Sequence, residues 1–210
     1  VTSLLIKNFV SNTFNISKEK ISYIPNWIDT SLFKPQKHIK NKVLYIGRFT
    51  EEKNIGLLLD ALSRSKLSVD ILGYGPEKNR IIDKIRNLNI DANLLDPISN
   101  TKIADLYSKY PVYVLCSRIE GNPKTLLEAM SSGCAVIGTD VPGIRDVIMH
   151  DKTGLLVKEN SKILSDTITQ LFNDLELKTR LSKNARQFIL SNNSIDRIID
   201  SEIQIYNKYK

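Results

Sequence analysis

Short apolar runs alternate with segments of helical periodicity from residue 42 to residue 157, and this pattern restricts the chain to few folds. In the first helical segment, Asn54 stands where it can cap the helix, and one face carries Ile55, Leu58, Leu59 and Leu62. Alternation at this spacing predicts βαβ units and a parallel sheet, which is an α/β fold. Nearly continuous apolar strands are expected when helices cover both faces of the sheet. The predicted strands are KVLYIG (42–47), SVDILG (68–73), ANLL (92–95), VYVLC (112–116), AVIGT (135–139) and GLLV (154–157).

The two ends of the chain follow a different pattern. Residues 3–15 read as a helix, ISYI (21–24) as a short strand, and the polar segment 25–41, with its two prolines, as a linker. Two or three helices complete the chain after residue 157. Further helices are expected from Gly75-Pro76 to about Leu88, around Ile103, Leu106 and Tyr107, near 123–132 with Gly133 closing it, near 143–149, and along an apolar stripe of Leu164, Ile168, Leu171 and Phe172.

The composition argues against several classes of function. Lys and Arg outnumber Asp and Glu by 30 to 23, a net charge of +7, but no Arg-rich run and no aromatic interleaving indicates nucleic-acid binding. The charge suits phosphate-bearing ligands or an acidic membrane surface, or it only solvates the protein. No apolar run approaches the ~20 residues that a membrane helix needs. Cys116 and Cys134 stand in apolar contexts typical of reduced core residues in a cytoplasmic protein, and no His/Cys cluster has the spacing of zinc ligands.

The loop after the first strand carries two cations. In open α/β sheets, ligands bind beyond the carboxyl ends of the strands, so these loops are where chemistry is expected. Arg48 and Lys53 lie there, directly after Gly47. A guanidinium fork and an ammonium point charge suit a diphosphate, and neutralising a departing diphosphate would promote its cleavage. The alternative is an ordinary surface Arg and Lys near a helix start.

The loop after residues 112–116 predicts an anion site at a helix start. Asn122 suits the N-cap and Pro123 the first helical position, so the backbone N–H groups of residues 122–125 would point out of the helix. Glu120 would lie just outside this helix and Glu128 ~8 Å inside it, at 1.5 Å per residue. Carboxylates there could accept hydrogen bonds from sugar hydroxyls. An amphipathic helix that happens to carry two glutamates is the alternative.

Two further turns are weaker candidates. Gly73 and Gly75, in the turn Gly73-Tyr74-Gly75-Pro76, would let a ligand approach the backbone closely, although an ordinary strand-to-helix turn explains them equally well. The loop Asp96-Pro97-Ile98 could lie beside a nucleobase or be a plain connection.

Together these segments resemble a known family. The ordered set is IPNWIDTSLFKP, VLYIGRFTEEKN, ILGYGP, YVLCSRIEGNPKTLLEAMSSGCAVIGTDVPGIRDVI and DKTGLLV. It is similar, from about residue 21 to residue 190, to the C-terminal, donor-binding half of GT-B-fold retaining glycosyltransferases, family four or the glycosyl transferases group 1 type. The Glu-x7-Glu element inside EGNPKTLLEAMSSG is its most specific part. The resemblance implies a Rossmann-like, doubly wound parallel sheet.

The resemblance also implies roles by position. Arg48 and Lys53 match the pair that contacts the donor diphosphate, Glu120 the residue that contacts the transferred sugar, and Glu128 the residue that holds the ribose hydroxyls. These roles make Arg48, Lys53 and Glu120 the candidate catalytic residues. The remaining candidate donor-binding positions are Gly47, Gly73, Gly75, Ile98 in the base-contacting loop, Gly121, Asn122, Pro123, Lys124, Thr125 and Leu126.

The sequence departs from the family pattern at three places. Trp27 stands where a glycine is commoner, Asp96-Pro97 replaces a pair that usually contains glycine, and Asn122-Pro123 stands where many members have Phe-Gly. The last variant leaves the donor sugar open.

The family resemblance divides the chain into three parts. Residues 1–41 are expected to be the tail of an absent N-terminal domain followed by the linker, residues 42–190 the Rossmann-like nucleotide-sugar-binding domain, and residues 191–210 a helix that packs toward the absent domain or within this one. The helix would do so through Ile195, Ile198, Ile199 and Tyr206. The first residue is Val rather than Met, which we interpret as an excised segment.

The function that the resemblance implies is transfer of a hexose from a UDP- or GDP-sugar to a saccharide or lipid-linked acceptor, with retention of configuration. No metal or other cofactor is expected, because side-chain cations would neutralise the diphosphate. The chain alone is expected to be inactive, since the acceptor site belongs to the absent domain. Polysaccharide biosynthesis for the cell envelope, in the cytoplasm or peripherally on the inner face of the membrane, would fit. The alternatives are a nucleotide-sugar-binding module without catalysis and a GT-B sugar-nucleotide epimerase.

Overall fold

A six-stranded parallel sheet organises the molecule. The computed structural model describes residues 1–96 and 98–208. The strand order is β3-β2-β1-β4-β5-β6, and every neighbouring pair is parallel, so the sheet is doubly wound and Rossmann-like as predicted. The strands are β1 (Val43–Ile46), β2 (Val69–Leu72), β3 (Ala92–Leu95), β4 (Val112–Leu115), β5 (Ala135–Thr139) and β6 (Leu155–Val157), at the six positions predicted from the apolar runs.

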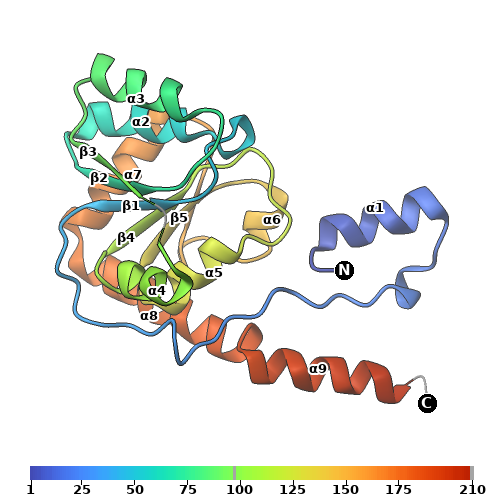
Figure 1. Cartoon of the computed structure of the whole chain (residues 1–210). Coiled ribbons are helices and arrows are strands. Elements are labelled where there is room, and N and C mark those ends of the chain that lie inside the picture. Colours follow the sequence, from blue (N-terminus) through green and yellow to red (C-terminus); the bar gives the residue numbers. More distant parts are fainter. Residues whose placement is uncertain (97, 209–210) are drawn as a thin grey trace.

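Helices cover both faces of this sheet (Figure 1). Helices α2, α3 and α7 lie over one face, and α4, α5, α6 and α8 lie over the other. The elements outside the sheet are α1 (Leu4–Phe14), the 3₁₀ helices η1 (Lys18–Lys20) and η2 (Glu51–Lys53), α2 (Ile55–Ser65), α3 (Lys78–Asn87), α4 (Asn100–Ser108), α5 (Lys124–Ser131), α6 (Pro142–Arg145), α7 (Ser161–Asn173), α8 (Leu175–Asn192) and α9 (Ile195–Lys208).

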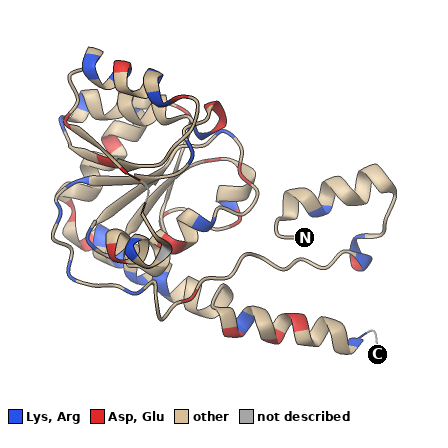
Figure 2. Ribbon diagram, in the orientation of Figure 1, with Lys and Arg blue, Asp and Glu red and all other residues tan. Residues whose placement is uncertain are grey.

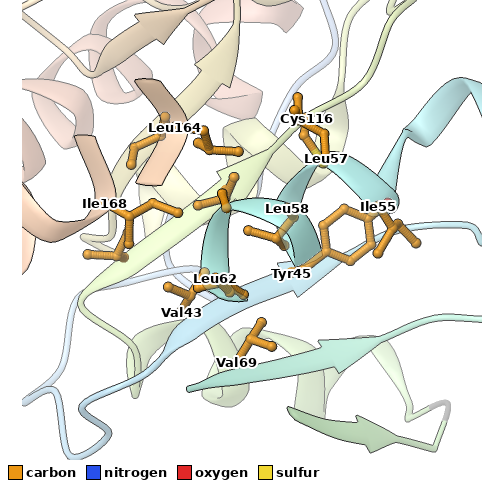
Figure 3. Close-up of a cluster of buried hydrophobic side chains, with 14 of the residues drawn as sticks. Val43, Tyr45, Ile55, Leu57, Leu58, Leu62, Val69, Cys116, Leu164 and Ile168 are labelled. Atoms are coloured by element: carbon orange, nitrogen blue, oxygen red, sulfur yellow. The ribbon is translucent and has the colours of Figure 1, made fainter. Parts of the chain in front are cut away.

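Two apolar clusters, one on each face, hold the layers together. Figure 3 shows the first, in which α2 and α7 pack side chains against β1 and β2. Burying one Leu or Ile side chain contributes roughly 1.5–3 kcal/mol, so each helix is held mainly by its apolar face. The predicted faces are confirmed, because Leu58, Leu62, Leu164, Ile168 and Leu171 are all buried.

Cys116 and Cys134 are buried, unpaired core residues, as predicted. Basic and acidic residues are interspersed over the helices and loops (Figure 2).

Two predicted elements differ in the structure. Residues 21–24 form no strand, because a strand needs a neighbouring strand as partner. In the described part of the chain this segment pairs laterally with the first residue alone: the N–H of Ile24 donates to the carbonyl of Val1, and the amine of Val1 donates to the carbonyl of Ser22, both at 2.9 Å. The helix expected near 143–149 is shorter and earlier, at Pro142–Arg145. Pro142 takes its first position because a proline needs no hydrogen-bonded N–H there.

Asn54 also differs from its predicted role. It occupies the N-cap position of α2, but its backbone is left-handed, with φ of 49°, and its side chain does not cap the helix. Its amide instead donates to Glu159 at 3.0 Å.

The predicted linker, residues 25–41, has no regular helix or strand but packs firmly on the domain. Ile28 and Phe33 are buried, and the N–H of Ile28 donates to the carbonyl of Asn193 at 2.8 Å. The guanidinium of Arg186 on α8 donates to the carbonyls of Phe33 and Thr30 at 2.6 and 2.9 Å. The segment therefore follows a defined path along the side of the domain.

Helices α1 and α9 extend away from the sheet on the same side (Figure 1). Apolar side chains on both are exposed, including Phe9 at 62% and Tyr206 at 69%. Of the expected stripe on α9, Ile198 is buried within this chain, whereas Ile199 is exposed. In the part of the chain that the structure describes, no helix combines the length and apolar character needed to cross a bilayer.

Candidate functional site

A cavity of about 500 Å³ opens between the carboxyl ends of β1 and β4. These two strands are neighbours in the sheet, but the chain leaves them toward opposite faces, which opens a crevice where open α/β sheets bind ligands. Its floor is apolar and its rim carries cations and a carboxylate. The residues that line it are Ile46, Gly47, Arg48, Lys53, Leu72, Gly73, Tyr74, Ile98, Ile103, Leu115, Glu120, Asn122, Pro123, Lys124 and Thr125.

Backbone contacts between two loops place Lys53 at this cavity. The loop after β1 turns through η2, and the N–H of Arg118, after β4, donates to the carbonyl of Glu52 at 2.8 Å. The thiol of Cys116 donates to the carbonyl of Asn54 at 3.2 Å. These contacts bring the two loops together across the ends of β1 and β4.

Lys53 and Glu120 form a buried ion pair. Lys53 Nζ lies 2.6 Å from Glu120 Oε1, and their side chains are only 16% and 8% exposed. The Ser117 hydroxyl donates to the same oxygen at 2.7 Å. Both donors meet Oε1, and no described residue donates to Glu120 Oε2, so this second oxygen can accept a hydrogen bond from a ligand hydroxyl.

Helix α5 begins one residue later than predicted. Pro123 takes the N-cap position and Lys124 is the first helical residue, whereas Asn122 was predicted as the cap. The Asn122 side chain instead accepts from the backbone N–H of Asn26 at 3.0 Å, since the linker packs against this turn. Among the described residues, the N–H groups of Lys124 and Thr125 have no backbone partner. The helix start therefore presents two free donors and the positive end of its dipole to the cavity.

Arg48 lies at the exposed rim. Its side chain is 64% exposed, and its Nη2 is 3.5 Å from Glu52 Oε1. An exposed pair of this kind contributes little to stability, so the guanidinium can turn toward a ligand at small cost.

Glu128, in α5, does not line the cavity. The Tyr107 hydroxyl, which is fully buried, donates to Glu128 Oε2 at 3.1 Å. Burial raises the pKa of Glu128 from 4.5 to about 7, while the Tyr107 hydrogen bond and the charge of Lys124 act in the opposite direction. The carboxyl therefore changes its charge near neutral pH.

Glu128→Gln is expected to flatten the pH dependence of stability. Because the pKa of Glu128 is about 7 in the folded chain and 4.5 is its ordinary value, the folded state holds a proton between these values that the unfolded state releases. Its contribution to stability is thus fully present below the unfolded pKa and is lost as the pH rises through about 7, by at most ~1.4 kcal/mol per pH unit. Urea unfolding of both proteins at several pH values from 4 to 8 measures this, and parallel curves would contradict it.

The cavity brings together most of the predicted site residues. Those that line it are Gly47, Arg48, Lys53, Gly73, Ile98, Glu120, Asn122, Pro123, Lys124 and Thr125, and those that do not are Gly75, Gly121, Leu126 and Glu128. Pro97, in the loop predicted beside a nucleobase, lies outside the described residues.

Packing within the chain is enough to explain why two of the predicted site positions are glycine. A Cβ on Gly73 would lie 1.9 Å from the carbonyl oxygen of Gly47, and one on Gly75 would lie 2.4 Å from that of Phe49. Gly75 also has φ of 150°, which disfavours any side chain.

Sequence reasoning missed the cavity's apolar floor and Tyr74. Ile46, Leu72 and Leu115 are the last residues of β1, β2 and β4 and line the cavity. Because ligands bind at the carboxyl ends of parallel strands, the positions of these residues at strand ends could have predicted that they line the cavity. Tyr74 is 67% exposed at the rim, where its ring can contact a ligand.

In residues 1–96 and 98–208, no group of three or more His, Cys, Asp or Glu side chains is placed to hold a metal ion. It stays a prediction that side-chain cations neutralise the diphosphate without a metal ion.

Comparison with known proteins identifies the family. The sequence model described as "Glycosyl transferases group 1" matches residues 29–188. The chain belongs to this family. Its six-stranded parallel sheet, flanked by helices, is the Rossmann-like fold that the sequence motifs predict.

Two relatives are similar over most of this chain. N-acetyl-alpha-D-glucosaminyl L-malate synthase of Bacillus anthracis is 29% identical over an alignment of 169 residues, which covers 78% of this chain and 44% of the relative. The GtfA subunit of the UDP-N-acetylglucosamine–peptide N-acetylglucosaminyltransferase of Limosilactobacillus reuteri is 30% identical over an alignment of 179 residues, which covers 78% of this chain and 35% of the relative. The chain therefore spans less than half of each of these relatives.

The fold is also that of a solved structure that contains UDP and glucose. Anabaena Alr3699/HepE, in complex with UDP and glucose, superposes with a TM-score of 0.89 at 17% identity, over 99% of this chain and 62% of the other. At this identity the likeness shows the fold alone.

Proposed function

We propose that this chain is the donor-binding half of a retaining glycosyltransferase, which moves a hexose from a nucleoside diphosphate sugar to a saccharide or lipid-linked acceptor. The observation that carries the proposal is one cavity at which Arg48, Lys53, Glu120 and the start of α5 meet. Cations and free N–H groups suit a diphosphate, and the open oxygen of Glu120 suits a sugar hydroxyl.

The arrangement supports departure of the diphosphate as the assisted step. When the bond between the sugar and the diphosphate breaks, negative charge grows on the departing phosphate oxygens. Donors already in place around that charge stabilise the transition state without reorganising. Lys53 is held for this role by Glu120, which could accept a sugar hydroxyl at the same time.

The relatives favour a uridine nucleotide. The Limosilactobacillus reuteri relative is named for UDP-N-acetylglucosamine, and the Anabaena structure contains UDP and glucose. We therefore propose a UDP-sugar as the donor, with a GDP-sugar as the alternative. Ile98 and the exposed ring of Tyr74 would lie near the base, and Glu128 would reach the ribose if α5 or Tyr107 adjusts.

Calorimetric titration of the 210-residue chain with UDP and GDP tests donor binding. Arg48→Ala is expected to weaken UDP binding about tenfold, which corresponds to about 1.4 kcal/mol, because a charged hydrogen bond to phosphate is lost. Arg80→Ala is the matched control, because Arg80 is likewise exposed and paired to a nearby glutamate but lies outside this cavity. Absence of binding, or equal weakening by both variants, would contradict the proposal.

Sugar transfer distinguishes an enzyme half from a binding module. We expect the chain alone to bind UDP weakly and to transfer no sugar, since we propose that the acceptor is held by a second domain facing the cavity. Assays with UDP-N-acetylglucosamine and UDP-glucose, with and without the proposed second domain, test this. Transfer by the isolated chain would place the acceptor site within these residues.

A further inference from the structure

Three cations line the cavity, and two of them are already neutralised. Lys53 pairs with Glu120 and Arg48 pairs with Glu52. Each pair adds no net charge to the site. A phosphate that binds either cation must therefore compete with a carboxylate.

Lys124 is the exception. Across the described part of the chain, no carboxylate lies within ion-pair distance of it, although its charge lowers the pKa of Glu128 on the same helix. Its ammonium instead lies over the indole ring of Trp27, 5.0 Å from the ring centroid. The ring attracts the cation through its quadrupole but carries no charge, so the charge of Lys124 stays available to a ligand.

Trp27 is held in place by the backbone of the linker. Asn26 Nδ2 donates to the carbonyl of Asn122 at 2.7 Å, and the backbone N–H of Asn26 donates to Asn122 Oδ1 at 3.0 Å. From the other side, Asn193 Nδ2 donates to the carbonyl of Asn26 at 2.9 Å. The linker is therefore joined to the turn that starts α5, and the ring of Trp27 stays beside the first residue of that helix.

Free lysine side chains lose much rotamer freedom on binding, so a ring that restricts one in advance reduces this loss. Lys124 lines the cavity while it contacts the ring, so both contacts exist together. We propose that Lys124 is a third phosphate-binding cation of the site and that Trp27 is a positioning residue that holds it at the cavity mouth. The proposal rests on the proposed binding of a nucleoside diphosphate.

The chain's one tryptophan makes this contact observable. Titration of the 210-residue chain with UDP is expected to change Trp27 fluorescence with the same Kd that calorimetry gives. In Lys124→Met, the fluorescence change should largely disappear, and the Kd should rise about tenfold with a shallower dependence on salt. Lys78→Met is the matched control, because Lys78 is likewise the exposed first residue of a helix but lies outside the cavity.

A double-mutant cycle separates positioning from a structural role. Trp27→Leu should raise the Kd for UDP about threefold, and Trp27→Phe should restore it, because phenylalanine also offers an aromatic face. In the Lys124→Met background, Trp27→Leu should have no further effect. An equal effect in both backgrounds would overturn the positioning role.

The controls also separate this inference from the proposed function. If the wild-type chain binds UDP and Arg48→Ala weakens binding, but Lys124→Met binds as the wild type does, the third cation is refuted and the donor site stands. If neither UDP nor GDP binds the wild-type chain, both proposals fail.

Discussion

Replacing Lys53 by methionine is expected to lower the free energy of unfolding by about 3 kcal/mol and to abolish detectable binding of UDP. The reason is the charge that the substitution leaves behind. Glu120 is 8% exposed and would keep only the Ser117 hydroxyl as a donor. A buried carboxylate without its cation retains the full penalty of desolvation.

The double variant Lys53→Met/Glu120→Gln should recover most of the stability but none of the binding. With both charges gone, no buried charge is left unpaired, and glutamine can still accept from Ser117. Urea unfolding and calorimetric titration with UDP, run on the two single variants and the double variant, measure the two effects separately. If Lys53→Met unfolded like the wild type, the ion pair would have no part in holding the loops together.

The second large effect is expected at Gly73. Gly73→Ala should reduce the free energy of unfolding by about 3 kcal/mol, the upper end of the usual range for overpacking. Its Cβ would lie 1.9 Å from the carbonyl oxygen of Gly47 and 2.7 Å from the ring of Phe49. The oxygen belongs to the backbone and cannot rotate away, so the ends of β1 and β2 must separate. Binding of UDP should weaken as well, because Gly47 and Gly73 both line the cavity.

Gly56→Ala is the control for this prediction. A Cβ there would meet only the end of the flexible Lys84 side chain, at 3.3 Å. Since Gly56 is helical and alanine favours helix, this variant should be as stable as the wild type or more so, by up to ~1 kcal/mol. Thermal unfolding of both variants compares them, and equal stability of Gly73→Ala and Gly56→Ala would show that the two loops can separate freely.

The sequence by itself determined the sheet and the edge at which the site lies. Strands β1, β2, β4 and β5 are buried along their whole length, so an apolar run of four or five residues is enough to predict them. Parallel strands joined by helices have all their carboxyl ends at one edge of the sheet. If the strands at 42–47 and 112–116 are neighbours, the loops that follow them are therefore neighbours too. For this reason Arg48, Lys53 and the turn at Asn122 were correctly expected to open onto one cavity.

Only the tertiary structure decided which groups meet, because these contacts join residues far apart in the chain. Lys53 and Glu120 are 67 positions apart, and Asn26 and Asn122 are 96 apart. The second contact also explains why Asn122 does not cap α5, since the linker takes the oxygen that the helix would have used. Residues 21–24 have the composition of a strand but form none, because a strand's hydrogen bonds come from a neighbour that local sequence does not specify.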